Sequence, residues 1–137
     1  MAITVVGDPA TNPRYYRKLD EIGLAVHRLP DRRVAYDQLA LVHTPSYLKR
    51  TGDGFSEEWV GRRPDLVVRA SKGAGAALRA ASLVYRDDAR KIFVPDGGRP
   101  HAGPDSSDRG CIYNDLAMTA MWLKRRGMKV AVVDLDG

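Results

Sequence analysis

The sequence predicts one α/β domain, residues 1–137, with a mostly parallel sheet and flanking helices. Short β-branched runs alternate with amphipathic segments, and this alternation is typical of βαβ units. The length of 137 residues is that of a single domain. Apolar residues make up 44% and charged residues 28% of the chain, which is the balance of a globular protein with a core.

The first expected elements are short. Ile3–Val6 is expected to form a strand that ends in a Gly-Asp-Pro turn. Residues 13–23 carry apolar side chains at helical spacing, and Gly23 would end this helix. His27 is expected to lie in a connector. The apolar run Leu39–His43 is expected to be the second strand.

The middle of the chain is predicted to be helical. Thr44 can cap a helix with Pro45 at its first position, and that helix would end near Gly52. Apolar residues show no regular spacing over residues 51–63, so this segment is expected to form a surface loop. Pro64 opens the longest helix, whose apolar stripe consists of Val67, Ala70, Ala74, Ala77, Leu78, Ala81 and Val84.

The last third of the chain is predicted to return to the sheet. Ile92–Val94 is expected to be the third strand, followed by a loop over residues 95–110. Asn114 would cap a helix that Gly127 ends. The final strand is expected at Val130–Asp134. The side chains expected to face inward from the last helix are Leu116, Ala117, Ala120, Met121 and Leu123.

The composition excludes several classes of protein. No apolar run approaches the ~20 residues of a membrane span, and the N-terminus lacks the features of a signal peptide. One cysteine allows no internal disulfide, so a cytoplasmic location is expected. The net charge of +5 is spread along the chain, which predicts a solvated basic surface. Weak, salt-sensitive binding to nucleic acid stays open as an alternative.

Two carboxylates stand at the end of the expected final strand. Asp134 and Asp136 follow an apolar run, and strand ends of α/β sheets border the crevice where ligands bind. Aspartate oxygens suit metal ions. The ending resembles the ending of a strand in two families of enzymes. The first is the haloacid-dehalogenase-type phosphatases, in which Asp134 would be the nucleophile; the second is indicated by motifs earlier in the chain.

Three upstream motifs separate the two families. They are His43-Thr44-Pro45-Ser46-Tyr47-Leu48, Gly97-Gly98-Arg99-Pro100-His101-Ala102 and Cys111-Ile112-Tyr113-Asn114-Asp115-Leu116-Ala117. In this order, and with the Asp-Leu-Asp ending, they resemble segments of the histone deacetylase and acetoin-utilisation family of metal amidohydrolases. The resemblance runs from about residue 39 to the end. It implies the N-terminal part of the arginase/deacetylase fold.

The resemblance also implies roles for single residues. His101 matches the general base that acts on a zinc-bound water. Pro100 replaces the first histidine of the family's pair, which implies weakened or lost catalysis. Asp136 matches the first zinc ligand, and Asp134 matches an aspartate that helps to bind a structural monovalent cation. The family's next ligand, a histidine, would follow Gly137.

Other matched positions concern the acyl channel. Gly98, Cys111 and Tyr113 match residues of that region, whereas His43 matches a structural segment. Gly110 replaces the family's aromatic residue and would remove one wall of an acyl-lysine tunnel. Without the resemblance, these positions are interpreted as an exposed loop histidine, a buried small cysteine, a helix cap and solvated carboxylates.

The leading hypothesis is a truncated deacetylase-like protein without a complete catalytic zinc site. It would be a noncatalytic binding module or one piece of a split enzyme. The alternatives are a fragment of an active zinc-dependent hydrolase of acetyl-lysine or acetylpolyamine amides, and the phosphatase. No cofactor is expected in the isolated chain, although the parent family uses zinc and potassium. A homodimer or a protein partner is expected to cover the truncated sheet near Val130, Val132 and Val133.

Overall fold

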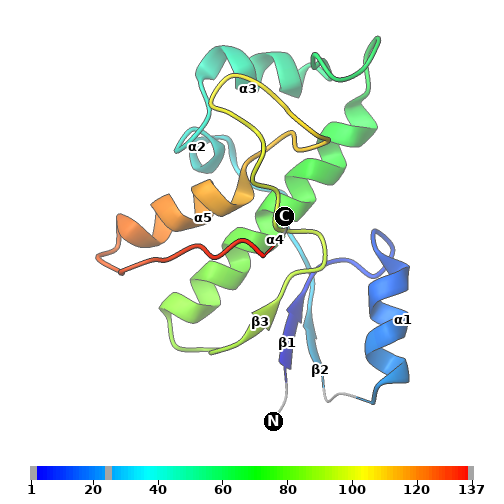
Figure 1. The fold of residues 1–137 in the computed structure, drawn as a ribbon, viewed down its shortest axis with the longest axis vertical. Helices are drawn as coiled ribbons and strands as arrows, with labels where there is room; N and C mark the ends of the chain where they lie inside the picture. Colours follow the sequence, from blue (N-terminus) through cyan, green and yellow to red (C-terminus); the bar gives the residue numbers. More distant parts are fainter. Residues whose placement is uncertain (1–2, 24–25, 136–137) are drawn as a thin grey trace.

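A small parallel sheet lies at one end of the molecule in the computed structural model, which describes residues 3–23 and 26–135 (Figure 1). Its strands are β1 (Ile3–Val6), β2 (Val26–Leu29) and β3 (Ile92–Phe93), and they pair in the order β2-β1-β3. Both pairings are parallel, so β1 is the central strand. The predicted α/β class with a parallel sheet is confirmed.

Five helices surround this sheet in the described part of the chain. They are α1 (Pro13–Glu21), α2 (Tyr36–Leu39), α3 (Pro45–Gly52), α4 (Pro64–Tyr85) and α5 (Asp115–Lys124). Figure 1 shows α4 running through the middle of the molecule, with α1 beside the sheet at one end and α2 and α3 at the other. None of the described helices combines the length and the apolarity that crossing a membrane requires.

Helix α4 has two buried faces, and each belongs to a separate part of the core. Ala74 and Leu78 pack with residues of α2, α3 and α5, including Tyr47 and Met118. On the sheet side, Val6 of β1 packs with the residues Ala76, Ala80 and Leu83. The predicted apolar stripe is therefore only partly correct: Ala74, Leu78 and Ala81 are buried, Val84 is 38% exposed, and α4 is buried from two directions.

Two glycines allow backbone to approach α4 closely. A Cβ atom at Gly75 would lie 1.6 Å from the carbonyl oxygen of Arg32, and one at Gly73 would lie 2.7 Å from the carbonyl oxygen of Asp96. No real Cβ tolerates such contacts with backbone atoms. The glycines therefore let the segments that follow β2 and β3 lie directly on the helix.

The expectation of a strand at Leu39–His43 is wrong. Leu39 ends the short helix α2, and turns follow it, with the His43 N–H donating to the Leu39 carbonyl at 3.0 Å. The side chain of Gln38 accepts a hydrogen bond from the Ala35 N–H at 2.9 Å and so stabilises the start of this helix. A five-residue apolar run does not distinguish a strand from a buried helical turn.

The second strand instead lies where a connector was expected. Val26–Leu29 pairs with β1, with Val26 and Leu29 half-buried and His27 and Arg28 exposed. Charged side chains are common on edge strands, where they discourage further pairing. Because Val26–Leu29 contains no continuous apolar run, its sequence pattern does not indicate a strand.

The expectation of a final strand at Val130–Asp134 is also wrong. Residues 128–135 form no helix or strand, and the side chains of Val132 and Val133 are 55% and 78% exposed. A strand requires a neighbour that accepts its backbone hydrogen bonds, and neither edge of the described sheet pairs with this segment. Figure 1 shows it as an extended trace that runs back from the far end of α5.

Candidate functional site: the loop around His101

The loop that carries His101 leaves β3 and reaches the start of α5. Gly98 has φ +82°, a left-handed conformation that favours glycine, and it lets the chain turn away from the sheet. His101 is exposed, and its ring has no hydrogen-bond partner among the described residues, whereas the next residue, Ala102, is buried. The His101 imidazole is thus exposed on a loop whose neighbouring residue is buried.

Asp115 holds the first part of this loop. Its Oδ1 atom accepts hydrogen bonds from the N–H groups of Gly98 at 3.2 Å and Arg99 at 3.0 Å. The side chain is 1% exposed, and its Oδ2 atom has no partner within the described chain. Burial raises the pKa of Asp115, although the two N–H donors oppose this shift.

Asn114 holds the backbone on both sides of His101. Its Nδ2 atom donates to the carbonyl oxygens of Pro100 at 2.8 Å and Ala102 at 3.0 Å. The Oδ1 atom of the same amide accepts from the Ala117 N–H at 2.9 Å and so caps α5, as predicted. One side chain therefore joins the start of the helix to the loop.

His43 holds the end of the loop. Its Nδ1 atom lies 2.9 Å from the Gly103 carbonyl oxygen, and its Nε2 atom accepts from the Asn114 N–H at 3.1 Å. These partners require a neutral ring with the proton on Nδ1. Burial lowers the pKa of His43, which favours the same neutral state. The Thr44 N–H adds a hydrogen bond to the Pro104 carbonyl at 2.8 Å.

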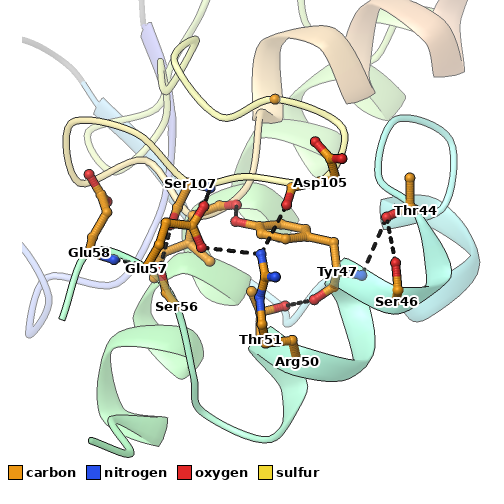
Figure 2. Close-up of polar contacts among 12 residues, drawn as sticks. Thr44, Ser46, Tyr47, Arg50, Thr51, Ser56, Glu57, Glu58, Asp105 and Ser107 are labelled. Atoms are coloured by element: carbon orange, nitrogen blue, oxygen red, sulfur yellow. Dashed lines mark hydrogen bonds and ion pairs between the residues drawn. The ribbon is translucent and has the colours of Figure 1, made fainter. Parts of the chain in front are cut away.

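A second network ties this loop to the region after α3 (Figure 2). Arg50 donates to the Glu57 carboxylate at 3.1 Å and to the Asp105 carbonyl at 2.9 Å. Glu57 in turn accepts from the Ser107 N–H at 2.6 Å. Burial opposes ionisation of Glu57, but hydrogen bonds from N–H groups and the Arg50 charge outweigh it and lower the pKa. The Glu58 carboxylate accepts from the Gly110 N–H at 3.0 Å.

Cys111 and Tyr113 lie in the core beside this loop. Cys111 is a buried free thiol, and its N–H donates to the Asp108 carbonyl at 2.8 Å. The Tyr113 hydroxyl lies 3.1 Å from Thr51 Oγ1, and its ring lies against that of His43. The role of Gly98, Cys111 and Tyr113 in an acyl channel stays a prediction.

Among the described residues, His101 and Asp134 belong to no group that could hold a metal ion. Asp134 lies on the exposed segment 128–135, and Asp136 lies outside the described residues. Across residues 3–23 and 26–135, no three His, Cys, Asp or Glu side chains converge so that they could hold a metal ion. A catalytic zinc ion needs three protein ligands around one point, so the zinc-ligand role of Asp136 and the cation role of Asp134 stay predictions.

The sequence patterns do not indicate most of the groups that hold the loop. Asn114 was expected to cap a helix and, by the resemblance, to help shape the acyl-channel region, whereas no role was predicted for Asp115. The one sequence signal is an Asn-Asp pair before an apolar helix, which predicts a cap but does not identify what the second side chain contacts. Glu57 and Glu58 lie in a segment without any period.

The described chain is thus an α/β domain with a parallel sheet, in which a histidine-bearing loop is anchored between β3 and the capped start of α5. The chain belongs to the histone deacetylase family, because residues 8–137 match the histone deacetylase domain. The phosphatase interpretation loses its basis, since it required a strand before Asp134 and none is present there.

Curated relatives and a solved structure agree with this assignment. The chain is 27% identical over 129 residues to the acetoin utilization protein AcuC of Staphylococcus aureus strain MRSA252, covering 82% of this chain and 33% of the relative. Histone deacetylase 6 of Caenorhabditis elegans is 27% identical over 148 residues, covering 93% of this chain and 15% of the relative. The chain thus spans about a third or less of these relatives.

The fold itself matches that of a solved homologue. The crystal structure of a histone deacetylase homologue complexed with SAHA superimposes with a TM-score of 0.75 at 16% identity, covering 93% of this chain and 42% of that one. At this identity the match concerns the fold alone. The predicted N-terminal part of the arginase/deacetylase fold is confirmed.

Proposed function

We propose that this chain supplies the His101 loop of a deacetylase-type domain but lacks a complete catalytic zinc site by itself. It acts as a noncatalytic module or as one piece of a two-part enzyme. One observation carries the proposal: the loop around His101 is held at both ends, while the aspartates expected to bind metal lie on or beyond an exposed segment without a strand.

The replacement at Pro100 supports a noncatalytic role. The family resemblance implies a histidine at this position, and a proline ring can neither bind a proton nor donate a hydrogen bond. The carbonyl of Pro100 still accepts from Asn114, so the backbone of the loop is held although the chemistry of the side chain is absent. A retained loop with an altered catalytic position is consistent with a role in binding.

An open surface beside the sheet supports a partner. A groove of about 540 Å³ lies between α4, α5 and β3, and its lining includes Ala77, Ala81, Val94, Leu116 and Leu123. Strand β3 pairs with β1 on one side only among the described strands. An apolar groove beside an unpaired strand edge is a favourable surface for another polypeptide. We propose a second copy of the chain or a separate protein as its occupant.

Calorimetric titration of chelator-treated protein with zinc tests the missing-site proposal. We expect no stoichiometric site of submicromolar affinity. We also expect no hydrolysis of acetyl-lysine peptides, because too few ligands converge near His101. Activity that persists through purification and disappears in His101→Ala would contradict the proposal.

An active parent domain is the second candidate function, and the held His101 loop favours it. A chimera tests this candidate by joining the whole chain, residues 1–137, to the part of the S. aureus AcuC relative that follows its aligned segment. If the chimera hydrolyses acetyl-lysine peptides and His101→Ala abolishes this, the chain is a piece of an active enzyme. If only Pro100→His restores turnover, the proline is the cause of inactivity. No turnover in either form supports the noncatalytic role.

A further inference from the structure

An aspartate follows the carboxyl end of each strand of the sheet. Asp8 follows β1, Asp31 follows β2 and Asp96 follows β3. Because the strands are parallel and adjacent, these ends meet at one edge of the sheet. In open α/β sheets this edge borders the crevice where ligands bind. The cluster uses none of the residues of the His101 site.

Asp96 is almost completely enclosed, and one of its oxygens lacks a partner. The side chain is 4% exposed. Its Oδ1 atom accepts a short hydrogen bond from Asn12 Nδ2, which also donates to the Pro95 carbonyl at 3.3 Å. Its Oδ2 atom is buried and has no hydrogen-bond partner in the part of the chain that the structure describes. An unpaired buried carboxylate oxygen is strongly unfavourable.

A second unpartnered oxygen borders the same space. Tyr16 of α1 is 3% exposed, and its hydroxyl has no partner within the described ranges. A Cβ atom at Gly7 would lie 2.8 Å from this hydroxyl and 3.6 Å from Asp96 Oδ2. Both oxygens therefore face the Cα atom of Gly7 at the end of β1. Asp31 Oδ2 is a further buried oxygen without a described partner.

The charges of the cluster do not balance. Lys72 of α4 pairs with Asp8, with 3.1 Å between Nζ and Oδ2. Neither Asp31 nor Asp96 forms an ion pair in the described chain, and Arg69 and Arg99 act on Asp96 only from a distance. Burial raises the pKa of Asp31 and that of Asp96. Two carboxylates thus lack a direct counter-charge, which a proton or a bound cation can supply.

We propose that a monovalent cation binds at the end of β1, between Asp96 Oδ2 and the Tyr16 hydroxyl. The donors are hard oxygens, which suit alkali and alkaline-earth cations rather than soft transition metals. No group of three acidic, His or Cys side chains in the described chain can hold a metal, so a divalent ion lacks the carboxylates it needs.

Thermal unfolding of the full chain tests the proposal in KCl, NaCl and choline chloride at equal ionic strength. We expect a saturable increase in Tm of about 2–6 °C in one of the two alkali salts over choline chloride. Asp96→Asn should remove this difference. Asp53→Asn, which removes an exposed carboxylate paired with Lys49, should keep it.

Sodium-23 line broadening gives a direct second measurement. Tyr16→Phe keeps the buried ring and removes only the hydroxyl, so it should fold while weakening the broadening several-fold. Asp53→Asn should leave the broadening unchanged, because Asp53 is exposed and pairs with Lys49. Equal Tm values in all three salts would overturn the proposal. So would a salt dependence that survives in Asp96→Asn, or an Asp96→Asn protein that is as stable as the wild type in every salt, which indicates a protonated Asp96.

Discussion

At the scale of single residues, the His101 site depends on side chains with one permitted hydrogen-bonding state. His43 donates through Nδ1 and accepts through Nε2, and both partners are backbone groups of other segments. Adding a proton to Nε2 would place two donors against each other at the Asn114 N–H. Protonation of His43 is therefore expected to weaken the contacts that hold the end of the His101 loop.

We predict that His43 makes the fold lose stability in mild acid. Burial lowers the pKa of His43 below its ordinary 6.5, so the unfolded chain binds this proton more readily than the folded one. The contribution is complete above pH 6.5 and is lost as the pH falls below that value, by up to about 1.4 kcal/mol per pH unit. Urea unfolding at pH 7.5 and 5.5 measures this loss.

A matched variant isolates the effect of this histidine. Asp31, Asp96 and Asp115 have raised pKa values, so they stabilise the folded state as the pH falls toward their unfolded value of 3.8. His43→Gln lacks the titrating group but keeps these acids. We expect its unfolding free energy to fall less than that of the wild type between the two pH values. Parallel pH profiles would exclude His43 as the sensitive group.

At the scale of elements, sequence signals found the helices better than the strands. Thr44, Pro45, Pro64 and Asn114 predicted the starts of three helices, because caps and prolines act through local geometry. The strand at Val26–Leu29 has a charged edge-strand composition and was missed. Pairing depends on neighbours distant in the chain, which a local pattern does not contain.

The same limit applies to the candidate site. The motif identified His101 and its loop, but not the contacts of Asp115 with Gly98 and Arg99, which join positions 16 and 17 residues apart. The expected strand before Asp134 had the right apolar composition and no neighbour to pair with. Composition predicts what a segment can form, and the available partners decide whether it does.

We predict that α4 tolerates no side chain at Gly75. The Cβ of Gly75→Ala would lie 1.6 Å from the Arg32 carbonyl oxygen, so helix and backbone must separate. We expect a loss of more than about 3 kcal/mol in unfolding free energy, or failure to fold. Chemical denaturation followed by circular dichroism measures this loss.

Gly52→Ala is the matched control for the substitution in α4. Gly52 ends α3, and a Cβ there would meet nothing within 4 Å. The variant should change the unfolding free energy by less than about 1 kcal/mol in either direction. If both variants have wild-type stability, the close approach of the 30–34 segment to α4 is not required for the fold.

At the scale of the whole molecule, two apolar surfaces are open to solvent. Residues 130–135 leave Val132, Val133 and Leu135 exposed, and the groove between α4, α5 and β3 is also mostly apolar. The core of the described chain consists mainly of two clusters around α4. Exposed apolar segments beside an unpaired strand edge favour association.

We predict that the chain forms a homodimer, or a complex with a partner, through the segment 130–135 and the adjacent groove. Light scattering at micromolar concentration should give a mass above that of a monomer. Val132→Asp and Val133→Asp should reduce this mass, because each places a charge in the contact while altering an exposed position. Val60→Asp, at a position that is 99% exposed but outside this surface, should not. A monomer with a cooperative melt would mean that the three-stranded sheet and its helices are stable alone, because the two clusters around α4 then supply enough buried surface without a partner.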